Sequence, residues 1–378
     1  MSKKGPKNDS SAKNDELLRL REEIDRVDLE ILGLLNERAQ LVKLVGGFKR
    51  KEGRSVYSFG RERDLISKLE KKNSGPFPVH GLAPVFKEIV SGTRSLERRL
   101  KVGYLGPEGT FSHLAALEAF GKQVEFLSKS SFTDILSEIV SGKLDHGLLP
   151  IENSTEGVVT QALDSLADVD VTIAGEVLLR VSLCIMSKTG SLKDVRRVAS
   201  HPQPLAQARK WLELHLPGVK KVPLPSTAEA ARLAVDSEDL AAIGPLISAE
   251  YSGLEVIERG IEDRQDNTTR FLILGGDAPS ASGSDLTSVV FTVRKDESGA
   301  LHRLLKPFAV HEVNLAGIQS RPLKGAPWEY RFFLDLEGHS EEVDVQKAIS
   351  AASEIATSTR VLGSFPRALD SQASKGNE

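Results

Sequence analysis

Apolar positions recur at alternating intervals of three and four residues near the start of the chain. This spacing is typical of an α-helix with one packing face, so a single long helix is predicted. Its apolar seam comprises Leu17, Leu20, Ile24, Val27, Ile31, Leu34, Leu41, Val45 and Phe48. A short helix is expected to open at Arg61, and a third carries Leu82, Phe86, Ile89, Leu96 and Leu100 on one face. The pattern predicts an all-α helical unit over residues 15–100.

Short apolar runs alternate with helical segments between residues 101 and 277. Strand-like runs lie near 101–105, 124–127, 147–149, 171–187, 195–199, 241–244 and 271–274, and helices are expected over 132–142, 203–215 and 228–236. Repeated strand–helix units predict an α/β fold. The long run 171–187 is expected to cross between two lobes, and the strand that begins near Thr269 to return the chain to the first lobe.

A third pattern follows a linker at 277–285 that is composed mainly of Ser, Ala and Asp, with one Pro and one Gly. Strands are expected at 287–293, 315–320, 329–336 and 361–364, with helices at 299–310 and 343–357. This order, βαββαβ, is typical of a ferredoxin-like α+β fold, here over residues 286–366. The polar ends, 1–14 and 367–378, are expected to be disordered. The chain is therefore predicted to be multi-domain, with all-α, α/β and α+β units in succession.

Length and composition support this division and exclude several classes of protein. A chain of 378 residues is too long for one hydrophobic core. A net charge of −3 argues against a nucleic-acid-binding protein. No apolar run is long enough to span a membrane, and the first residues lack the apolar segment of a secretion signal. The lone Cys184 and the absence of metal-ligand spacings predict a cytoplasmic protein without disulfide or metal.

Cations interrupt the apolar seam of the first helix. Arg38 occupies the next seam position after Leu34, and a guanidinium there is costly unless an anion meets it. Lys49 lies about three turns further on, on nearly the same face. Arg21 is roughly 25 Å from Arg38 along a straight helix, so one small ligand can contact all three only if Arg21 comes from a second copy. The alternative is a helical bundle with three solvent-exposed cations.

The residues around these cations resemble the all-helical chorismate mutase family. The resemblance is carried by Leu20-Arg21-Glu22-Glu23-Ile24-Asp25, Leu34-Leu35-Asn36-Glu37-Arg38, Lys49, Arg61-Glu62-Arg63 and Phe86-Lys87-Glu88-Ile89. It implies an intertwined homodimer in which Arg21 enters the partner's site. It also implies that Arg21 and Arg38 hold the carboxylates of chorismate, and that Lys49 and Glu97 contact its ether oxygen. The full set of contacts implied is Arg21, Arg38, Lys49, Ser58, Arg61, Glu62, Thr93 and Glu97.

Two positions depart from residues common in that family. Ser58 stands where an acidic residue often contacts the ring hydroxyl, and Glu97 stands where a glutamine can occur. A carboxyl group donates a hydrogen bond only when it is protonated. We therefore expect the mutase activity to fall as the pH rises. The rearrangement is unimolecular, so it needs a held conformer and placed donors rather than a nucleophile or a cofactor.

Four polar turns punctuate the α/β unit at strand ends, which is where open α/β sheets bind ligands. They are 106–113, 150–157, 200–204 and 263–270. Glycines at 103, 106 and 109 lead into the first turn with the spacing GxxGxxG, and Pro107 lies within it, so a dinucleotide site is not expected. This turn is interpreted as a helix start capped by Thr110 or Ser112. Polar groups crowded before the apolar strand at Phe271 indicate either a site or a hydrogen-bonded loop.

These turns resemble prephenate dehydratase, whose two lobes surround a cleft as in periplasmic solute-binding proteins. The carrying segments run from Tyr104 to His113, Leu149 to Ser154, Ser200 to Gln203 and Asp266 to Phe271. The resemblance implies an essential Thr269, which we assign as proton donor or relay at the leaving hydroxyl, with Glu152 and His113 as candidate proton sources. The contacts expected for prephenate are Ser112, Glu152, Asn153, Ser154, Ser200, Gln203, Thr268, Thr269 and Arg270.

The last unit resembles the ACT regulatory domain, on the strength of Gly299-Ala300-Leu301, Asn314-Leu315, Ser320-Arg321-Pro322 and Trp328-Glu329. That family binds L-phenylalanine across a dimer interface and is inhibited by it. Gln319 replaces a common glutamate, which leaves the sign and strength of the effect open. The effector contacts implied are Gly299, Ala300, Leu301, Asn314, Leu315, Gln319, Ser320, Arg321 and Pro322.

The three resemblances together suggest a bifunctional enzyme that converts chorismate to phenylpyruvate through prephenate, with feedback by L-phenylalanine. One alternative is a non-catalytic two-lobed binding protein with a sensor domain. Another is a mutase fused to a prephenate dehydrogenase. The Thr269 motif argues against the first alternative, and the missing dinucleotide fingerprint argues against the second. A preference for arogenate over prephenate stays open.

Overall fold

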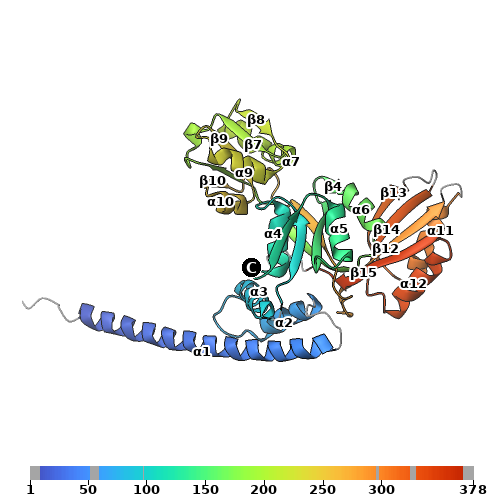
Figure 1. Ribbon diagram of the computed structural model, residues 1–378, viewed down its shortest axis with the longest axis horizontal. Coiled ribbons are helices and arrows are strands. Elements are labelled where there is room, and N and C mark those ends of the chain that lie inside the picture. The colour runs from blue at the N-terminus through green and yellow to red at the C-terminus, as the bar shows by residue number, and fades with distance from the viewer. Residues whose placement is uncertain (1–8, 52–58, 97, 295–297, 324–328, 369–378) are drawn as a thin grey trace, which may run out of the picture.

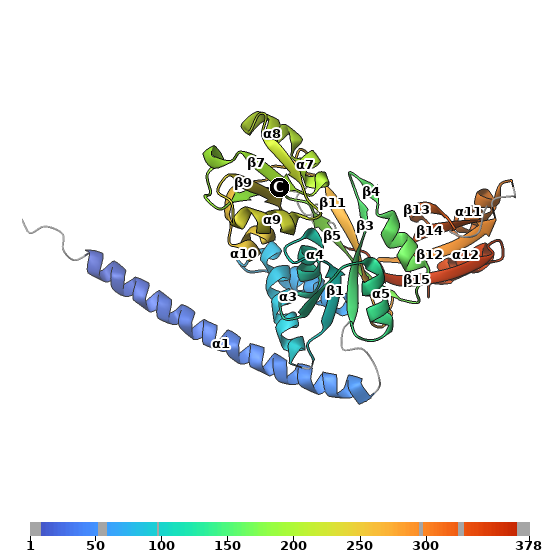
Figure 2. The ribbon, with the colours of Figure 1, turned by 45° about the horizontal axis from the view of Figure 1, so that its top comes forward.

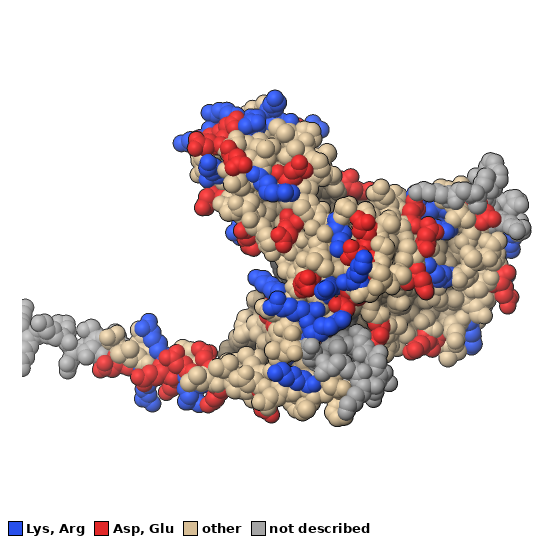
Figure 3. Space-filling model, in the orientation of Figure 1, with Lys and Arg blue, Asp and Glu red and all other residues tan. Residues whose placement is uncertain are grey.

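The computed structural model describes residues 9–51, 59–96, 98–294, 298–323 and 329–368, which form three units along the chain (Figure 1). Side chains are described within these ranges except at 9–13, 49–51, 59 and 294. Both Lys and Arg and Asp and Glu are spread over the visible face, with some local groups of like charge (Figure 3). Among the described residues, no helix is both long and apolar enough to cross a bilayer.

The first unit consists of α1 (Asp9–Lys51), α2 (Phe59–Lys72) and α3 (Val79–Ser95). Helix α1 is a single 43-residue helix that carries the predicted seam, and its N-terminal half projects beyond the rest of the chain (Figure 1). It begins at Asp9, so the disorder expected over residues 1–14 is wrong for residues 9–14, which are helical. The seam is largely exposed to solvent: Ile24 and Leu34 are 59% and 65% exposed. A row of exposed aliphatic side chains on a projecting helix means that this chain alone does not bury its own apolar seam.

The second unit has two lobes, each built on a mixed sheet. In lobe one the strand order is β2 (Glu125–Lys129), β1 (Lys101–Leu105), β3 (His146–Asn153), β11 (Thr268–Leu274) and β5 (Ile173–Arg180), and β4 (Gly157–Val158) pairs with β3. Its helices are α4 (Phe111–Phe120), α5 (Phe132–Val140) and α6 (Thr160–Ala167). The core on the α4 side of the sheet is separate from the core on the α5 and α6 side.

Lobe two contains the strands β10 (Glu255–Arg259), β6 (Cys184–Ser187), β9 (Leu240–Gly244), β7 (Arg197–Ser200) and β8 (Lys220–Pro223), in that order. Its helices are α7 (Pro202–Gln207), α8 (Arg209–His215), α9 (Thr227–Val235) and α10 (Leu246–Ser252). The chain crosses between the lobes from β5 to β6 and returns from β10 to β11 (Figure 2). This confirms the predicted crossover within 171–187 and the return through the strand of Thr269.

The C-terminal unit is a four-stranded antiparallel sheet in the order β13, β14, β12, β15. Its elements are β12 (Asp285–Arg294), α11 (Ala300–Val310), β13 (Leu315–Pro322), β14 (Glu329–Glu337), α12 (Val343–Ser353) and β15 (Ser358–Pro366). The last strand is longer than the predicted 361–364, because it pairs with β12 along nearly the whole strand. Helices α11 and α12 cover one face of the sheet around Phe291 and Phe308.

The other face of this sheet packs against lobe one. Leu286 and Phe333 of the C-terminal sheet share one hydrophobic core with Leu163 and Leu166 of α6. Strand β15 also approaches β5 closely at Gly363, where a Cβ atom would lie 2.3 Å from the carbonyl oxygen of Ile173. Only glycine permits this approach, because any side chain there would overlap the backbone of β5. The two units are therefore joined by a continuous core.

Candidate active sites

Thr269 lies at the beginning of β11, beside the last residue of β3. The amide nitrogen of Asn153 donates to Thr269 Oγ1 over 2.9 Å and to Asn267 Oδ1 over 2.8 Å. Asn153 and Asn267 are both buried. The three residues form a hydrogen-bonded cluster between the two strands where the chain re-enters lobe one.

The turn after β3 fixes which way the Asn153 amide points. Its Oδ1 accepts hydrogen bonds from the backbone N–H groups of Thr155 and Glu156, each over 3.0 Å. Backbone N–H groups can only donate, so the amide nitrogen must face Asn267 and Thr269. Because Asn153 donates to Thr269 Oγ1, the threonine proton is left to donate elsewhere. The cluster therefore presents Thr269 as a hydrogen-bond donor.

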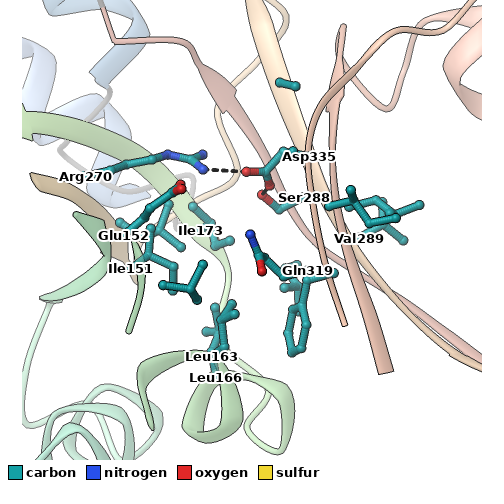
Figure 4. A pocket seen from close by; sticks show the side chains of 18 residues that line it. Ile151, Glu152, Leu163, Leu166, Ile173, Arg270, Ser288, Val289, Gln319 and Asp335 are labelled. Atoms are coloured by element: carbon teal, nitrogen blue, oxygen red, sulfur yellow. Dashed lines mark hydrogen bonds and ion pairs between the residues drawn. The ribbon is translucent and has the colours of Figure 1, made fainter. Parts of the chain in front are cut away.

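Glu152 comes directly before Asn153 in β3, so its side chain leaves the opposite face of the sheet from this cluster. Its ladder partner is Arg270, whereas Phe271 pairs with Pro150, which leaves Ile151 as an extra residue in a β-bulge. Glu152 and Arg270 both line a cavity toward the C-terminal unit, on the sheet face opposite Thr269 (Figure 4). The structure thus does not bring them to the predicted prephenate contacts, and Glu152 is not beside Thr269 as a proton source.

Ser154 and Thr268 fasten the two strands to each other. The backbone N–H of Thr268 donates to Ser154 Oγ over 3.0 Å, and the N–H of Ser154 donates to the Thr268 carbonyl over 2.9 Å. The side chain of Thr268 alternates with that of Thr269 and so leaves the other face of β11. These two residues hold the cluster in place, whereas a direct substrate contact had been predicted for both.

The remaining predicted dehydratase contacts differ in accessibility. Ser112 and Gln203 are half-buried in the first turns of α4 and α7. Ser200 is completely buried, and its hydroxyl donates to the Ile243 carbonyl over 2.6 Å, so the predicted contact with prephenate is not available in this arrangement. Its hydroxyl instead ties β7 to β9. The cap of α4 is Thr110, one of the two residues expected.

His113 is buried and holds the first polar turn. Its Nδ1 accepts the N–H of Gly109 over 3.2 Å, and its ring stacks on Tyr104 with 4.8 Å between centroids. Burial lowers the pKa of His113, although Glu108 opposes this effect. The imidazole is therefore neutral near pH 7 and accepts a hydrogen bond. These properties favour the structural interpretation over a role as proton source.

In the helical unit, two neighbouring residues of α3, Thr93 and Arg94, connect this helix to α1 and to α2. Arg38 of α1 donates to the Thr93 hydroxyl, and Arg94 pairs with Glu62 of α2 over 2.9 Å. The side chains of Arg94 and Glu62 are only 9% and 13% exposed. The structure therefore brings Arg38, Glu62 and Thr93 together, as predicted. Arg61 is exposed at the start of α2.

Other predicted mutase residues lie away from this cluster or outside the described residues. Arg21 is exposed on the projecting half of α1. Lys49 belongs to α1, but its side chain is not among the described ones, and Ser58 and Glu97 lie outside the described residues altogether. The predictions made for these three side chains thus remain predictions.

The sequence interpretation missed Arg94. It follows Thr93 directly, and Arg61, Glu62 and Arg94 all carry charge, but no helical period shows which charges turn inward. Burial raises the pKa of Glu62, and Arg94 counteracts this by stabilising the carboxylate. Burial also lowers the pKa of Arg38, assisted by the positive charge of Arg94. Arg94 is therefore the counter-ion of Glu62 in this half-buried, charged interior.

The predicted effector residues do not form one cluster within a single chain. Gly299, Ala300 and Leu301 lie at the start of α11, whereas Asn314 and Leu315 follow its end. The eleven residues of α11 separate the two groups by about 17 Å along the helix axis. Arg321 instead makes two hydrogen bonds of 3.0 Å to Asp164 of lobe one. Further along β13, Gln319 lines the cavity toward lobe one, Ser320 is exposed, and Pro322 ends the strand.

Comparisons with known proteins identify related families over the first two units. The family model for chorismate mutase type II matches residues 20–98, and that for prephenate dehydratase matches residues 102–279. The bifunctional chorismate mutase/prephenate dehydratase of Aquifex aeolicus is 43% identical over 94% of this chain and 99% of its own. That of Escherichia coli K12 is 31% identical over 93% of this chain and 96% of its own.

A solved structure resembles the part that follows the helical unit. The prephenate dehydratase of Arthrobacter aurescens in complex with L-Phe is 35% identical, with a TM-score of 0.66, over 71% of this chain and 90% of its own. The matches to complete bifunctional relatives thus extend over the helical cluster, the Thr269 cluster and the C-terminal sheet alike. On these grounds the chain belongs to the bifunctional chorismate mutase/prephenate dehydratase family.

Proposed function

We propose that residues 15–100 rearrange chorismate to prephenate and that residues 101–277 convert prephenate to phenylpyruvate at Thr269. The observation that carries the second assignment is the hydrogen bond from Asn153 to Thr269 Oγ1. Because the Asn153 amide donates this bond, the Thr269 proton is not used in it and can be donated to a ligand. Both reactions are redox-neutral, and we propose that neither requires a cofactor.

The dehydratase step expels carbon dioxide and the ring hydroxyl of prephenate, and aromatisation of the ring drives it. The hydroxyl leaves readily only if a proton or a strong hydrogen bond reaches it. A threonine hydroxyl is too weak an acid to release its proton freely, so Thr269 acts as a donor or relay. Asn153 keeps that donor oriented, and burial of Asn153 and Asn267 keeps water from competing for it.

The mutase step requires that chorismate be held in a compact conformer. Arg38, positioned by Thr93, supplies one cation for a substrate carboxylate. Arg21 supplies another from a second copy of the chain, because it lies on the projecting half of α1 and far from Arg38 in its own chain. The exposed apolar seam of α1 supports this homodimer, since pairing of two copies would bury it.

The C-terminal unit, residues 286–366, is proposed to be an ACT domain that binds L-phenylalanine. Its strand order supports the ferredoxin-like fold. The distance between the two groups of effector residues supports a site shared by two copies, in which Gly299 of one faces Asn314 of the other. The relative from Arthrobacter aurescens, whose structure contains L-Phe, supports the choice of effector.

The test is to supply chorismate to the purified full-length chain without any nucleotide. The proposed function predicts that phenylpyruvate forms and that L-phenylalanine slows its formation. Accumulation of prephenate alone would contradict the dehydratase assignment. Conversion only when a nicotinamide nucleotide is added would indicate a dehydrogenase, and binding without any turnover would indicate a solute-binding protein.

A further inference from the structure

Thr269 and Arg270 are neighbours on β11 whose side chains leave opposite faces of the sheet. Thr269 meets Asn153, whereas Arg270 reaches toward the C-terminal unit (Figure 4). Its Nη1 pairs with Asp335 Oδ2 of β14 over 2.5 Å, and its Nε pairs with Glu176 Oε2 of β5 over 2.7 Å. One guanidinium therefore joins the strand of Thr269 to the adjacent strand of lobe one and to the C-terminal sheet.

Burial and charge make this connection stiff. The side chains of Arg270 and Asp335 are mostly buried, and Glu176 is almost fully so. Burial alone would lower the pKa of Arg270, but Asp335 and Glu176 outweigh it and raise the pKa above its usual value. The guanidinium is thus charged at every physiological pH and held from two sides. A buried guanidinium that loses one carboxylate partner is left with an uncompensated charge, which is costly, so Arg270 is expected to move with its partners.

The partner Asp335 is in turn held within the C-terminal sheet. The hydroxyl of Ser288 in β12 donates to Asp335 Oδ1, and Asp335 lies opposite Gly317 of β13 in the ladder. Strand β13 begins at Leu315, one of the expected effector contacts, and Gln319 further along lines the cavity beside Arg270. This cavity, of about 130 Å³, leaves room for the polar side chains at its rim to shift.

We propose that Arg270 is a positioning residue, which transmits the position of Asp335 in the C-terminal sheet to the Thr269 hydroxyl. A shift of β13 and β14 moves Asp335. Arg270 follows it, and the start of β11 moves relative to Asn153, which weakens the alignment of the Thr269 donor. This inference rests on the proposed dehydratase function and gives it a structural route of regulation. It also replaces the predicted contact between Arg270 and prephenate.

The test compares Asp335→Asn with Asp168→Asn in the full-length chain. Asp168 pairs with Arg331 over 2.6 Å across the same interface but lies at the end of α6, away from β11. Both variants lose one carboxylate charge at this interface, but Asp335 is also more buried than Asp168, whose side chain is 65% exposed, so a second variant at Arg270 completes the comparison. Dehydratase rates are measured with prephenate over a series of L-phenylalanine concentrations, and L-phenylalanine binding is measured by calorimetry.

Asp335→Asn is expected to lower kcat several-fold with little change in KM for prephenate. It should also weaken the inhibition by saturating L-phenylalanine about tenfold, within the usual range of allosteric coupling, while the Kd for L-phenylalanine stays within about twofold. Asp168→Asn should behave as the unmodified chain in all respects. The mutase rate, whose site is in another unit, serves as the folding control and should be unchanged in both variants.

Equal kcat and equal inhibition in Asp335→Asn and the unmodified chain would overturn the inference. If L-phenylalanine does not inhibit the unmodified chain, the proposed effector is wrong, yet the kcat of Asp335→Asn still tests the link to Thr269. Arg270→Lys provides a second variant, because a lysine keeps the charge but cannot bridge two carboxylates in the same fork. It should reproduce the loss of kcat, and a normal kcat there would also contradict the inference.

Discussion

Asn153 determines what the Thr269 hydroxyl can do. A free threonine hydroxyl donates one hydrogen bond and accepts two, and the Asn153 amide fills one of its two acceptor positions, so the hydroxyl proton points away from Asn153. The motif resemblance predicted Thr269 and Asn153 as site residues from sequence. The same resemblance predicted Glu152 as a contact, although neighbouring residues of a strand leave opposite faces of the sheet, so Glu152 faces away from Asn153 and Thr269. The bulge at Ile151, which no alternation of apolar residues reveals, changes the register only beyond this pair.

Arg94 provides a test of the mutase site at the same scale. In Arg94→Met the pKa of Glu62, already raised by burial, should rise further because its counter-ion is lost. If the Glu62 carboxylate contacts the substrate, the acid limb of the mutase kcat/KM profile moves to higher pH. A shift of one pKa unit corresponds to an approximately tenfold lower rate on that limb. The pH profile of kcat/KM is measured between about pH 5 and 9.

Two controls separate this effect from simple loss of structure. Arg94→Lys keeps the charge beside Glu62 and should keep the profile, as should Arg98→Met, which alters an exposed arginine just beyond α3. Lys87 and Arg38 also face Glu62 and stay in place in all three variants. Because the pKa of Glu62 is higher in the folded than in the unfolded chain, its contribution to stability is fully present below the unfolded pKa. That contribution is lost as the pH rises through the folded pKa. Arg94→Met should therefore lose most Tm at alkaline pH.

An unchanged profile in Arg94→Met, together with a lower Tm, would show that Arg94 stabilises the helices without setting the charge of Glu62. Removing one partner of a buried ion pair costs about 3 kcal/mol or more, so a loss of stability alone decides nothing about the site. The pH profile is the measurement that distinguishes the two roles.

At the scale of elements, the sequence predicted helix α1 well but did not show what covers its apolar seam. The three–four spacing predicted a helix with a seam, and the structure contains it as one uninterrupted element. The spacing does not show what covers the seam, because the same pattern suits an intramolecular bundle and an intertwined dimer. The exposure of Leu34 and Ile24 within one chain favours the dimer.

Leu34→Glu tests this inference, with Asn36→Glu as the matched control. Asn36 is exposed on the same helix, about 200° around its axis from Leu34, so the same glutamate there avoids the seam. A charge placed in a packed seam is strongly unfavourable. Leu34→Glu should convert the dimer to monomer at micromolar concentration by light scattering and lower mutase activity at least about tenfold, because Arg21 of the second copy is lost.

Asn36→Glu should keep both the molar mass and the mutase rate of the unmodified chain. A Leu34→Glu variant that remains a fully active dimer would show that α1 does not mediate assembly, and that Arg21 reaches its substrate in some other way.

At the scale of the whole molecule, the order and type of the three units followed from periodicity, but their contacts did not. Strand alternation shows which face of the C-terminal sheet is apolar. It does not show that α6 covers that face. Arg321 was expected to bind the effector, whereas the structure pairs it with Asp164. Arg360 likewise donates to the carbonyls of Leu166 and Val169 at the end of α6. Charged residues at such interfaces have no sequence period, so only the assembled fold identifies their partners.

The two activities occupy separate units, so one substitution should remove one activity and spare the other. The most direct measurement supplies chorismate to purified Thr269→Ala and Thr269→Ser and follows both prephenate and phenylpyruvate. Loss of a placed donor typically costs at least about a hundredfold in rate. We predict that Thr269→Ala accumulates prephenate at the unmodified mutase rate with almost no phenylpyruvate, and that Thr269→Ser, which keeps a hydroxyl, restores much of the second step. Phenylpyruvate formed by Thr269→Ala at the unmodified rate would contradict the assignment of Thr269.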